Sequence, residues 1–162
     1  MSCESSKSFG NDSCDNTIDG NESTVWTSGL NAPDYNDPKT LVDHKIQWGY
    51  NTFVKILFEK EIVVTGVQIT NKVEEEYFYE NYKDVMISFS DGFEKQVTLS
   101  PSGKQNRIVT MEHPVQSSFV NILGVSTFSH MPEGHFPGTR HSGYRSGISE
   151  IRIFGCDAGK SS

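Results

Sequence analysis

The sequence predicts an all-β domain, namely an eight-stranded antiparallel β-sandwich. Its 162 residues are rich in Gly, Asn, Asp and Ser and poor in Ala and Leu, a composition typical of strands and turns rather than helices. Short runs rich in Val, Ile and Phe recur along the chain, and turn signals separate them. The length suits one domain with a sizeable core. Many short strands at this spacing favour a two-layer sandwich.

The charge balance restricts the partners. The net charge is −7 and the isoelectric point is about 5.2, which argues against nucleic acid and against binding of anionic lipid by charge alone. No apolar run approaches the length of a transmembrane helix, and the opening Met1-Ser2-Cys3-Glu4 does not resemble a signal peptide. We therefore expect either a cytosolic protein or a mature fragment that carries an added start methionine.

Each expected strand is an alternating or largely apolar run. The eight main runs cover residues 5–9, 53–58, 62–70, 84–90, 93–99, 106–111, 118–127 and 147–154, and residues 46–50 add a short strand. Glu59-Lys60-Glu61 and His113-Pro114 are expected to turn the chain between neighbouring strands. Asp91-Gly92 is expected to form the turn of a hairpin, because Gly readily adopts the positive φ that such turns require.

Strand direction predicts which connections lie together. Antiparallel strands alternate in direction, so alternate connections lie at opposite ends of a sandwich. Four connections, at residues 27–45, 73–83, 100–105 and 128–146, fall at one end, and three of them are long. The short connections fall at the other end and cover residues 59–61, 91–92 and 112–117. Long irregular loops on a rigid scaffold are common sites of recognition, so we expect the binding site at the first end.

Residues 16–26 form an oxygen-rich stretch that ends on a large aromatic side chain. Asp19-Gly20 forces a tight turn, and the surrounding Asn, Asp, Glu, Ser and Thr residues offer the oxygen ligands that calcium prefers. Trp26 and Ile18 would attach the loop to a core. The alternating acidic pattern of an EF-hand is absent. Taken alone, the stretch is compatible with a calcium site and with an ordinary polar turn, and the ordinary turn is the simpler interpretation.

Four blocks of sequence, in order, cover essentially the whole chain. They are residues 16–26 (Asn-Thr-Ile-Asp-Gly-Asn-Glu-Ser-Thr-Val-Trp), residues 53–58 with 63–67, residues 89–92 (Phe-Ser-Asp-Gly) and residues 148–156 (Ile-Ser-Glu-Ile-Arg-Ile-Phe-Gly-Cys). Together they resemble the discoidin domain, also called the coagulation factor V/VIII type C domain. The resemblance implies a galactose-binding-like jelly roll. We expect a single domain of this type at residues 1–157, followed by a flexible tail at 158–162. Phe53 stands where that family usually has Trp.

The resemblance also implies a structural calcium ion. Many carbohydrate-binding relatives hold calcium between this opening turn and the glutamate of the last strand. Carried over by position, the ligands are backbone carbonyls at Asn16 and Asn21, the side chains of Asp19 and Thr24, and the carboxylate of Glu150. Two carboxylates from opposite ends of the chain would repel each other without a cation or strong donors between them. The alternative is that Asp19 caps its own turn and Glu150 pairs with an arginine.

The chain has three cysteines, at positions 3, 14 and 156. In the strand order that the resemblance implies, Cys3 and Cys156 lie together, and members of the family often carry this bridge. We therefore expect a Cys3–Cys156 disulfide that closes the domain, with Cys14 left as a thiol. The alternative is three reduced thiols in a cytosolic protein.

The long connections carry the residue types of a sugar site. Such a site combines an aromatic face for the C–H side of the ring with fixed polar groups for its hydroxyls. The candidates with a role in ligand binding are His44, Tyr79, His135, Arg140 and His141. The connection 73–83 also contributes Tyr77, Phe78 and Tyr82. A zinc site from His130, His135 and His141 is a weaker alternative, because the spacing matches no standard pattern.

No catalytic motif is present. The chain lacks Gly-x-Ser-x-Gly, a paired Cys/His signature and a phosphate-binding glycine loop, so we expect no enzyme activity. The leading interpretation is an extracellular or cell-surface module that binds a glycan or glycoprotein. The second is a protein- or phospholipid-binding adhesion module, for which Leu30, Met131 and Phe136 are the apolar candidates. The third is an intracellular adaptor with the same fold.

Overall fold

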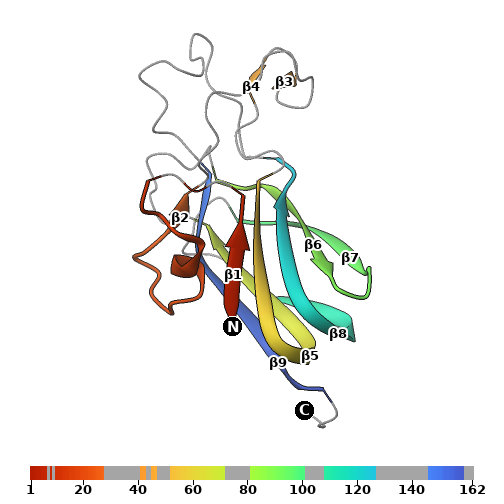
Figure 1. The fold of residues 1–162 in the computed structure, drawn as a ribbon. Coiled ribbons are helices and arrows are strands. Elements are labelled where there is room, and N and C mark those ends of the chain that lie inside the picture. The colour runs from red at the N-terminus through yellow and green to blue at the C-terminus, as the bar shows by residue number, and fades with distance from the viewer. Residues whose placement is uncertain are drawn as a thin grey trace.

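The computed structural model describes residues 1–6, 8, 10–27, 41–42, 45–46, 52–71, 81–100, 108–126 and 146–158, with the backbone alone at 41–42 and 45–46. The strands, shown in Figure 1, are β1 (Ser2–Ser5), β2 (Trp26–Thr27), β3 (Leu41–Val42), β4 (Lys45–Ile46), β5 (Phe53–Asn71), β6 (Asp84–Phe89), β7 (Glu94–Thr98), β8 (Ile108–Gly124) and β9 (Gly147–Asp157). One short 3-10 helix, η1 (Cys14–Thr17), follows β1. Within these residues no helix has the length and apolar character needed to cross a membrane.

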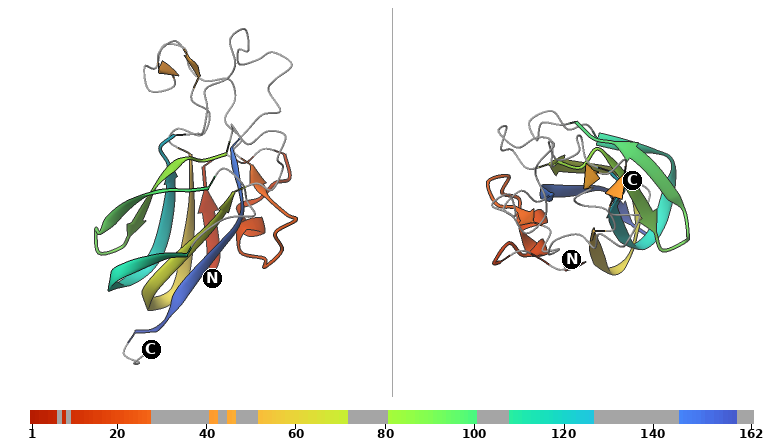
Figure 2. Two further views of the ribbon diagram at one scale, coloured as in Figure 1. Left: turned by 180° about the vertical axis from the view of Figure 1, so that it is seen from behind. Right: turned by 90° about the horizontal axis from the view of Figure 1, so that it is seen from above.

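The two long strands β5 and β8 take part in both layers of the sandwich. They pair antiparallel along their length, with a shift in register between Leu57 and Ile62. The first half of β5 also pairs with β1, whereas the second half pairs with β9. One layer therefore contains β1, β5, β8, β6 and β7, and the other contains β8, β5, β9 and β2. Figures 1 and 2 show β5 and β8 bending at the end of the molecule near the C-terminus.

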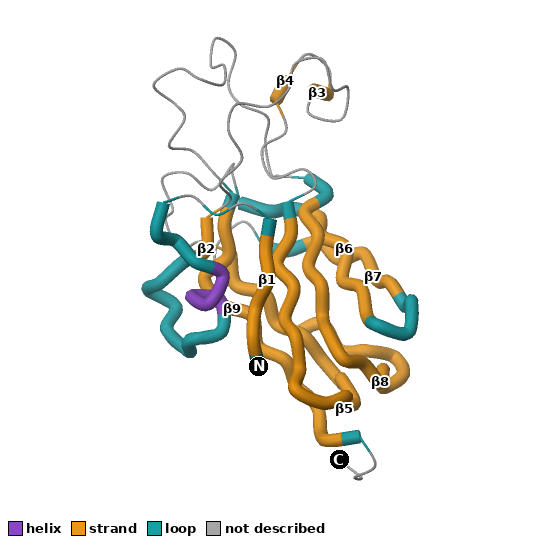
Figure 3. Tube along the Cα trace, viewed as in Figure 1, coloured by secondary structure: helices purple, strands orange, loops and turns teal. Residues whose placement is uncertain are grey.

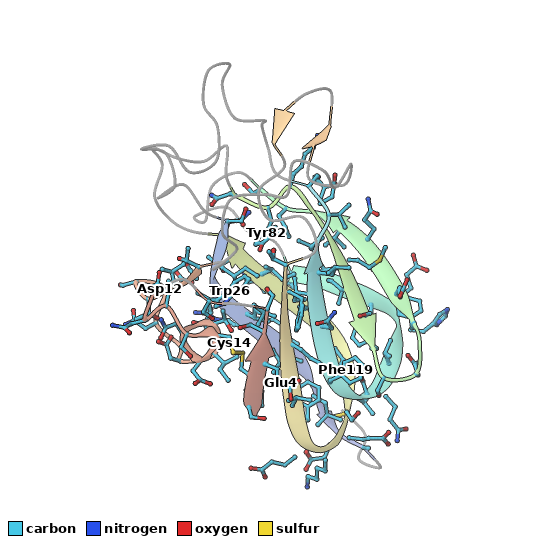
Figure 4. The ribbon with its side chains drawn as sticks, turned by 45° about the horizontal axis from the view of Figure 1, so that its top comes forward. Glu4, Asp12, Cys14, Trp26, Tyr82 and Phe119 are labelled. Carbon is cyan, nitrogen blue, oxygen red and sulfur yellow. A yellow bond between two sulfur atoms is a disulfide. The ribbon has the colours of Figure 1, made fainter. Side chains whose placement is uncertain are left out.

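Alternating side chains fill the space between the layers. Val54 and Ile56 are fully buried, while Lys55 between them faces outward, where its ammonium group lies 4.0 Å from the ring centroid of Phe119. Trp26 is fully buried as well, and its indole N–H donates to Ser8 Oγ at 3.0 Å (Figure 4). A buried indole requires such a partner, so this bond fixes the end of the oxygen-rich stretch on the core.

The predicted all-β sandwich is confirmed, but three local expectations are wrong. Glu59-Lys60-Glu61 and His113-Pro114 lie inside β5 and β8 rather than between separate strands. The three charged residues 59–61 lie exposed on the bend, where they do not interrupt the strand. The first strand is Ser2–Ser5 rather than 5–9.

The disulfide joins Cys3 to Cys14, so the expected Cys3–Cys156 bridge is wrong. Cys3 pairs with Ile56 in the first half of β5, whereas Cys156 pairs with Val63 beyond the bend. Gly10, with a φ of +56°, helps to turn the chain after β1, and η1 packs against β1. This return brings the Cα atoms of Cys3 and Cys14 to 6.1 Å, well within the range of a disulfide.

Candidate functional site

Four segments of the chain are flanked by described residues that lie at one end of the sandwich, which we call the loop end. They cover residues 28–51, 72–80, 101–107 and 127–145, and β3 and β4 form a small hairpin within the first of them. The loop end is defined by the described residues Thr27, Thr52, Asn71, Tyr82, Ser100, Ser126 and Ser146 that flank these segments. Figure 3 shows the strands ending together at this side of the molecule.

Backbone hydrogen bonds tie these flanks to one another. The N–H of Gly124 donates to the carbonyl of Thr52 at 2.8 Å, and the N–H of Lys83 donates to the carbonyl of Ser126 at 2.8 Å. Thr27 pairs with Gly147 across β2 and β9. The expectation that the long connections share one end is therefore confirmed for the residues that flank them.

The segments expected as short connections, residues 59–61, 91–92 and 112–117, lie at the opposite end, although the first and third lie within the continuous strands β5 and β8. The hydroxyl of Ser117 contacts the Ser90 backbone there, and the amide of Gln116 donates to the carboxylate of Glu61 at 2.7 Å. The ion pair between Lys60 and Asp157, 3.4 Å apart, lies at the same end. The described residues that flank all four segments thus lie at the end opposite these contacts.

The five predicted ligand-binding residues, namely His44, Tyr79, His135, Arg140 and His141, lie outside the described residues, and so do Leu30, Met131 and Phe136. Tyr82 is described, and it is 1% exposed. It therefore belongs to the core under the loop end rather than to the aromatic surface expected for 73–83 (Figure 4).

The oxygen-rich loop, residues 16–24, begins on η1. Ser13 caps this helix, and the chain then reverses at Gly20, where φ is +77°. Asp19 stabilises the reversal because its Oδ1 accepts the N–H of Asn21 at 2.8 Å. The loop is held to the sandwich from both sides, since Trp26 follows it and the Cys3–Cys14 bridge precedes it.

Oxygen atoms gather around the hydroxyl of Thr24. This Oγ1 lies 2.6 Å from Asp19 Oδ2, 2.8 Å from the carbonyl of Asn21 and 3.4 Å from the carbonyl of Asn16. A hydroxyl carries one proton, so it satisfies only one of these three acceptors as a donor. Carboxylate, carbonyl and hydroxyl oxygens are the ligand types that a hard cation prefers.

Glu150 of β9 brings a second carboxylate to this loop. Its side chain is 3% exposed, and its Oε2 atom has no hydrogen-bond partner within the described part of the chain. Burial, followed by the negative charge of Asp19, raises the pKa of this carboxyl, whereas a hydrogen bond from the Gly20 N–H and the charge of Arg152 lower it. A buried carboxylate oxygen without a donor is costly, and a bound cation would remove that cost.

All five predicted metal-binding residues are therefore brought together: Asn16, Asp19, Asn21, Thr24 and Glu150. The alternative interpretation is seen in part, because Asp19 does cap its own turn. The alternative named no particular arginine; Arg152 forms an ion pair with Glu22 at 3.4 Å, and its charge also lowers the pKa of Glu150.

The zinc alternative rests on His130, His135 and His141, which lie outside the described residues. Among the side chains that the structure does place, no three of His, Cys, Asp and Glu gather as a metal site of that kind would require.

Sequence reasoning missed the polar residues beneath the loop end. Thr52, Asn71 and Asn81 are at most 2% exposed and flank the undescribed segments. Nothing in their sequence positions distinguishes them from ordinary polar residues at strand ends, so no signal in the sequence could have identified them.

No protein-family model matches the chain, and a search of curated proteins found no match. Solved structures do match. The family 32 carbohydrate-binding module of NanJ from C. perfringens, in complex with galactose, superposes with a TM-score of 0.62 at 16% identity and covers 94% of this chain and 91% of its own. The family 32 module of AlyQ, in complex with 4,5-unsaturated mannuronic acid, has a TM-score of 0.54 at 15% identity, with 95% and 94% covered.

A third similar structure is chitosan-binding module 1 from a chitosanase/glucanase of Paenibacillus sp. IK-5. Its TM-score is 0.57 at 13% identity, and the match covers 95% of this chain and 94% of that one. At these identities the likeness shows the fold and leaves the ligand to be inferred from the site.

Proposed function

Because the chain has the discoidin-type, galactose-binding-like jelly-roll fold, we propose that it is a non-catalytic module that binds a glycan or glycoprotein at its loop end. The observation that carries this proposal is the convergence of the flanks of all four long segments at one end of a rigid sandwich. Those segments contain His44, Tyr79, His135, Arg140 and His141. Similar structures named for galactose, a mannuronic acid and chitosan support sugars as the ligand class.

The chemistry proposed for the loop end is that of sugar recognition. An aromatic side chain such as Tyr79 would pack against the C–H face of the ring. Arg140 and the histidines would hold hydroxyl or acidic groups in fixed directions. A charged donor gives the stronger hydrogen bond, so Arg140 carries more of the affinity than the aromatic residue.

A structural calcium ion is the second part of the proposal. The carbonyls of Asn16 and Asn21, the side chains of Asp19 and Thr24, and the Glu150 carboxylate would hold it. The partnerless Oε2 of Glu150 and the oxygens around the Thr24 hydroxyl support this assignment. When bound, calcium supplies positive charge between two carboxylates that otherwise repel each other. The residues of this chain then fix the oxygen-rich loop against β9.

An extracellular or cell-surface location is the third part. The Cys3–Cys14 disulfide supports it, because such bonds persist in oxidising compartments. A cytoplasmic adaptor with the same fold is the alternative, and it would keep these two cysteines reduced.

The test of the proposed function is a glycan array run beside a liposome pull-down with the parent protein. Binding to one group of neutral or acidic sugars, without retention on phosphatidylcholine or phosphatidylserine vesicles, is the expected result. Retention on vesicles with a blank array would replace the glycan with a phospholipid surface. Binding to neither would leave a protein partner as the ligand class.

A further inference from the structure

A buried polar cluster lies beneath the loop end and belongs to neither proposed site. We call it the base cluster, and it consists of Thr52, Asn71 and Tyr82. Thr52 and Asn71 are fully buried and Tyr82 is 1% exposed. Burial of a polar group costs free energy unless the group is hydrogen-bonded. The hydrogen bonds of this cluster therefore fix the positions of the residues that make them.

Asn71 is the last residue of β5, and both the nitrogen and the oxygen of its side-chain amide form hydrogen bonds. Its Nδ2 donates to the carbonyl of Tyr82 at 2.9 Å and to the carbonyl of Ser100 at 3.0 Å. Its Oδ1 accepts the N–H of Tyr82 at 3.2 Å. Asn71 therefore joins both ends of segment 72–80 to the beginning of segment 101–107.

Tyr82 extends the network to the other two segments. Its phenol group is hydrogen-bonded to the hydroxyl of Thr52, which directly follows segment 28–51. The carbonyl of Thr52 in turn accepts the N–H of Gly124, close to the start of segment 127–145. Burial keeps the phenol protonated, because it raises the pKa of Tyr82 far above the usual tyrosine range. One continuous set of buried and partly buried hydrogen bonds thus connects a flank of each of the four segments.

We propose that Asn71 and Tyr82 are positioning residues that couple the described flanks of the four segments, so that affinity for a glycan at the loop end depends on both residues although neither contacts it. The dependence of affinity rests on the proposed function, whereas the coupling itself does not. Without Asn71, the carbonyls of Tyr82 and Ser100 and the N–H of Tyr82 lose buried partners. Those groups would then favour open conformations in which water satisfies them.

The test compares Asn71→Ala with a control at the opposite end of the sandwich. Ser117 is also fully buried, and its hydroxyl bonds to Ser90 and Phe119. Ser117→Ala should therefore weaken the fold to a similar extent without touching the loop end. Amide hydrogen exchange is measured at Tyr82, Lys83 and Leu99, and at Ile56 and Val120 as core references.

In Asn71→Ala we expect exchange at Tyr82, Lys83 and Leu99 to rise about tenfold or more relative to the core amides. In Ser117→Ala that ratio should stay at the parent value. Tyr82→Phe removes only the bond to Thr52, so it should raise exchange at Gly124 and leave Leu99 unchanged. If Asn71→Ala does not fold, Asn71→Asp tests the same point, because it keeps the acceptor for Tyr82 and loses both donor bonds.

Glycan affinity is measured in parallel by titration calorimetry with D-galactose and with a mannuronic-acid oligosaccharide. A loss of affinity in Asn71→Ala that exceeds the loss in Ser117→Ala supports the positioning role. Equal exchange ratios in these two variants would overturn the coupling. Unchanged affinity in Asn71→Ala, with a parent that binds, would overturn the positioning role. A parent that binds neither sugar, with a raised ratio in Asn71→Ala, would count against the proposed function and leave the coupling standing.

Discussion

The carboxyl group of Glu150 is buried beside Asp19, although the two residues come from the last strand and from the loop near the start of the chain. Burial, and then the charge of Asp19, raises the pKa of Glu150. The Gly20 N–H is the donor that the Glu150 carboxylate has in this loop, and its Oε2 has none within the described residues. From this relationship we predict that the stability of the domain depends on calcium and on pH.

Calcium should raise the melting temperature of the parent protein. A ligand that binds only the folded state stabilises it by about 2.7 kcal/mol at a concentration one hundred times its dissociation constant. Asp19→Ala and Glu150→Ala should abolish the response in differential scanning calorimetry. Glu22→Gln is the control, because it removes an acidic residue of the same loop that is not among the proposed ligands. A parent whose melting temperature is the same in calcium and in chelator would rule out the site.

The pH dependence without calcium should have a definite sign. Glu150 has a raised pKa in the folded protein, so the unfolded chain loses this proton at a lower pH than the folded protein does. Stability in chelator should therefore fall as pH rises from the ordinary glutamate pKa through the raised one. Glu150→Gln should lack this decrease in urea titrations over the same range. A parent and a variant with parallel profiles would show that Glu150 does not titrate differently on folding.

The disulfide assignment can be checked by peptide mapping without reduction. We expect a linked pair of peptides that contains Cys3 and Cys14, with Cys156 outside the bridge. Cys14→Ser should lower the free energy of unfolding by about 3 kcal/mol, because the bridge closes a loop of moderate length in the unfolded chain. Cys156→Ser is the control and should leave the bridge intact. A peptide linking Cys3 to Cys156 would restore the pairing expected from the sequence.

Gly155, in the closing block of the sequence, is predicted to be intolerant of a side chain. A Cβ atom at this position would overlap the carbonyl oxygen of Val63 on the neighbouring strand. Gly155→Ala should destabilise the fold by about 3 kcal/mol or more, since a strand cannot shift as a side chain can. At Gly66 a Cβ atom would meet the side chain of Ile108 at 3.1 Å, so Gly66→Ala should cost less. Equal unfolding free energies for the two variants would contradict this reading.

The fold class was predictable because strand patterns depend on local alternation and composition. Val54 and Ile56 flank Lys55 in the sequence and share the inward face of the strand, opposite to Lys55. Asp91-Gly92 specifies a tight turn, and Gly92 has the expected positive φ of +91°. The bends within β5 and β8 were not predictable in this way. In any short window of sequence, the charged residues 59–61 indicate a turn. In the structure β5 continues through them, because it pairs with β8 on one edge and with β1 and then β9 on the other.

The oxygen-rich loop was also predictable, because most of its atoms come from one short stretch of sequence and the resemblance supplied Glu150. The disulfide was not, since it depends on where the chain turns between Cys3 and Cys14. A first strand placed at 5–9 instead of Ser2–Ser5 separates the two cysteines by the length of a strand. The base cluster required three-dimensional contacts among Thr52, Asn71 and Tyr82 that no spacing in the sequence encodes.

The measurement that tests the central claim most directly is calorimetric titration of the glycan that binds best on the array. It is run on the parent, on Arg140→Ala and Tyr79→Ala, and on Lys60→Ala, which removes a charge at the opposite end of the sandwich. We predict that Arg140→Ala weakens binding more than Tyr79→Ala, by about 1.5–3 kcal/mol, because in the proposed site Arg140 would donate a charge-assisted hydrogen bond to the sugar. Lys60→Ala should bind like the parent. Full affinity in both loop variants would place the site elsewhere, and no glycan binding by the parent would contradict the account.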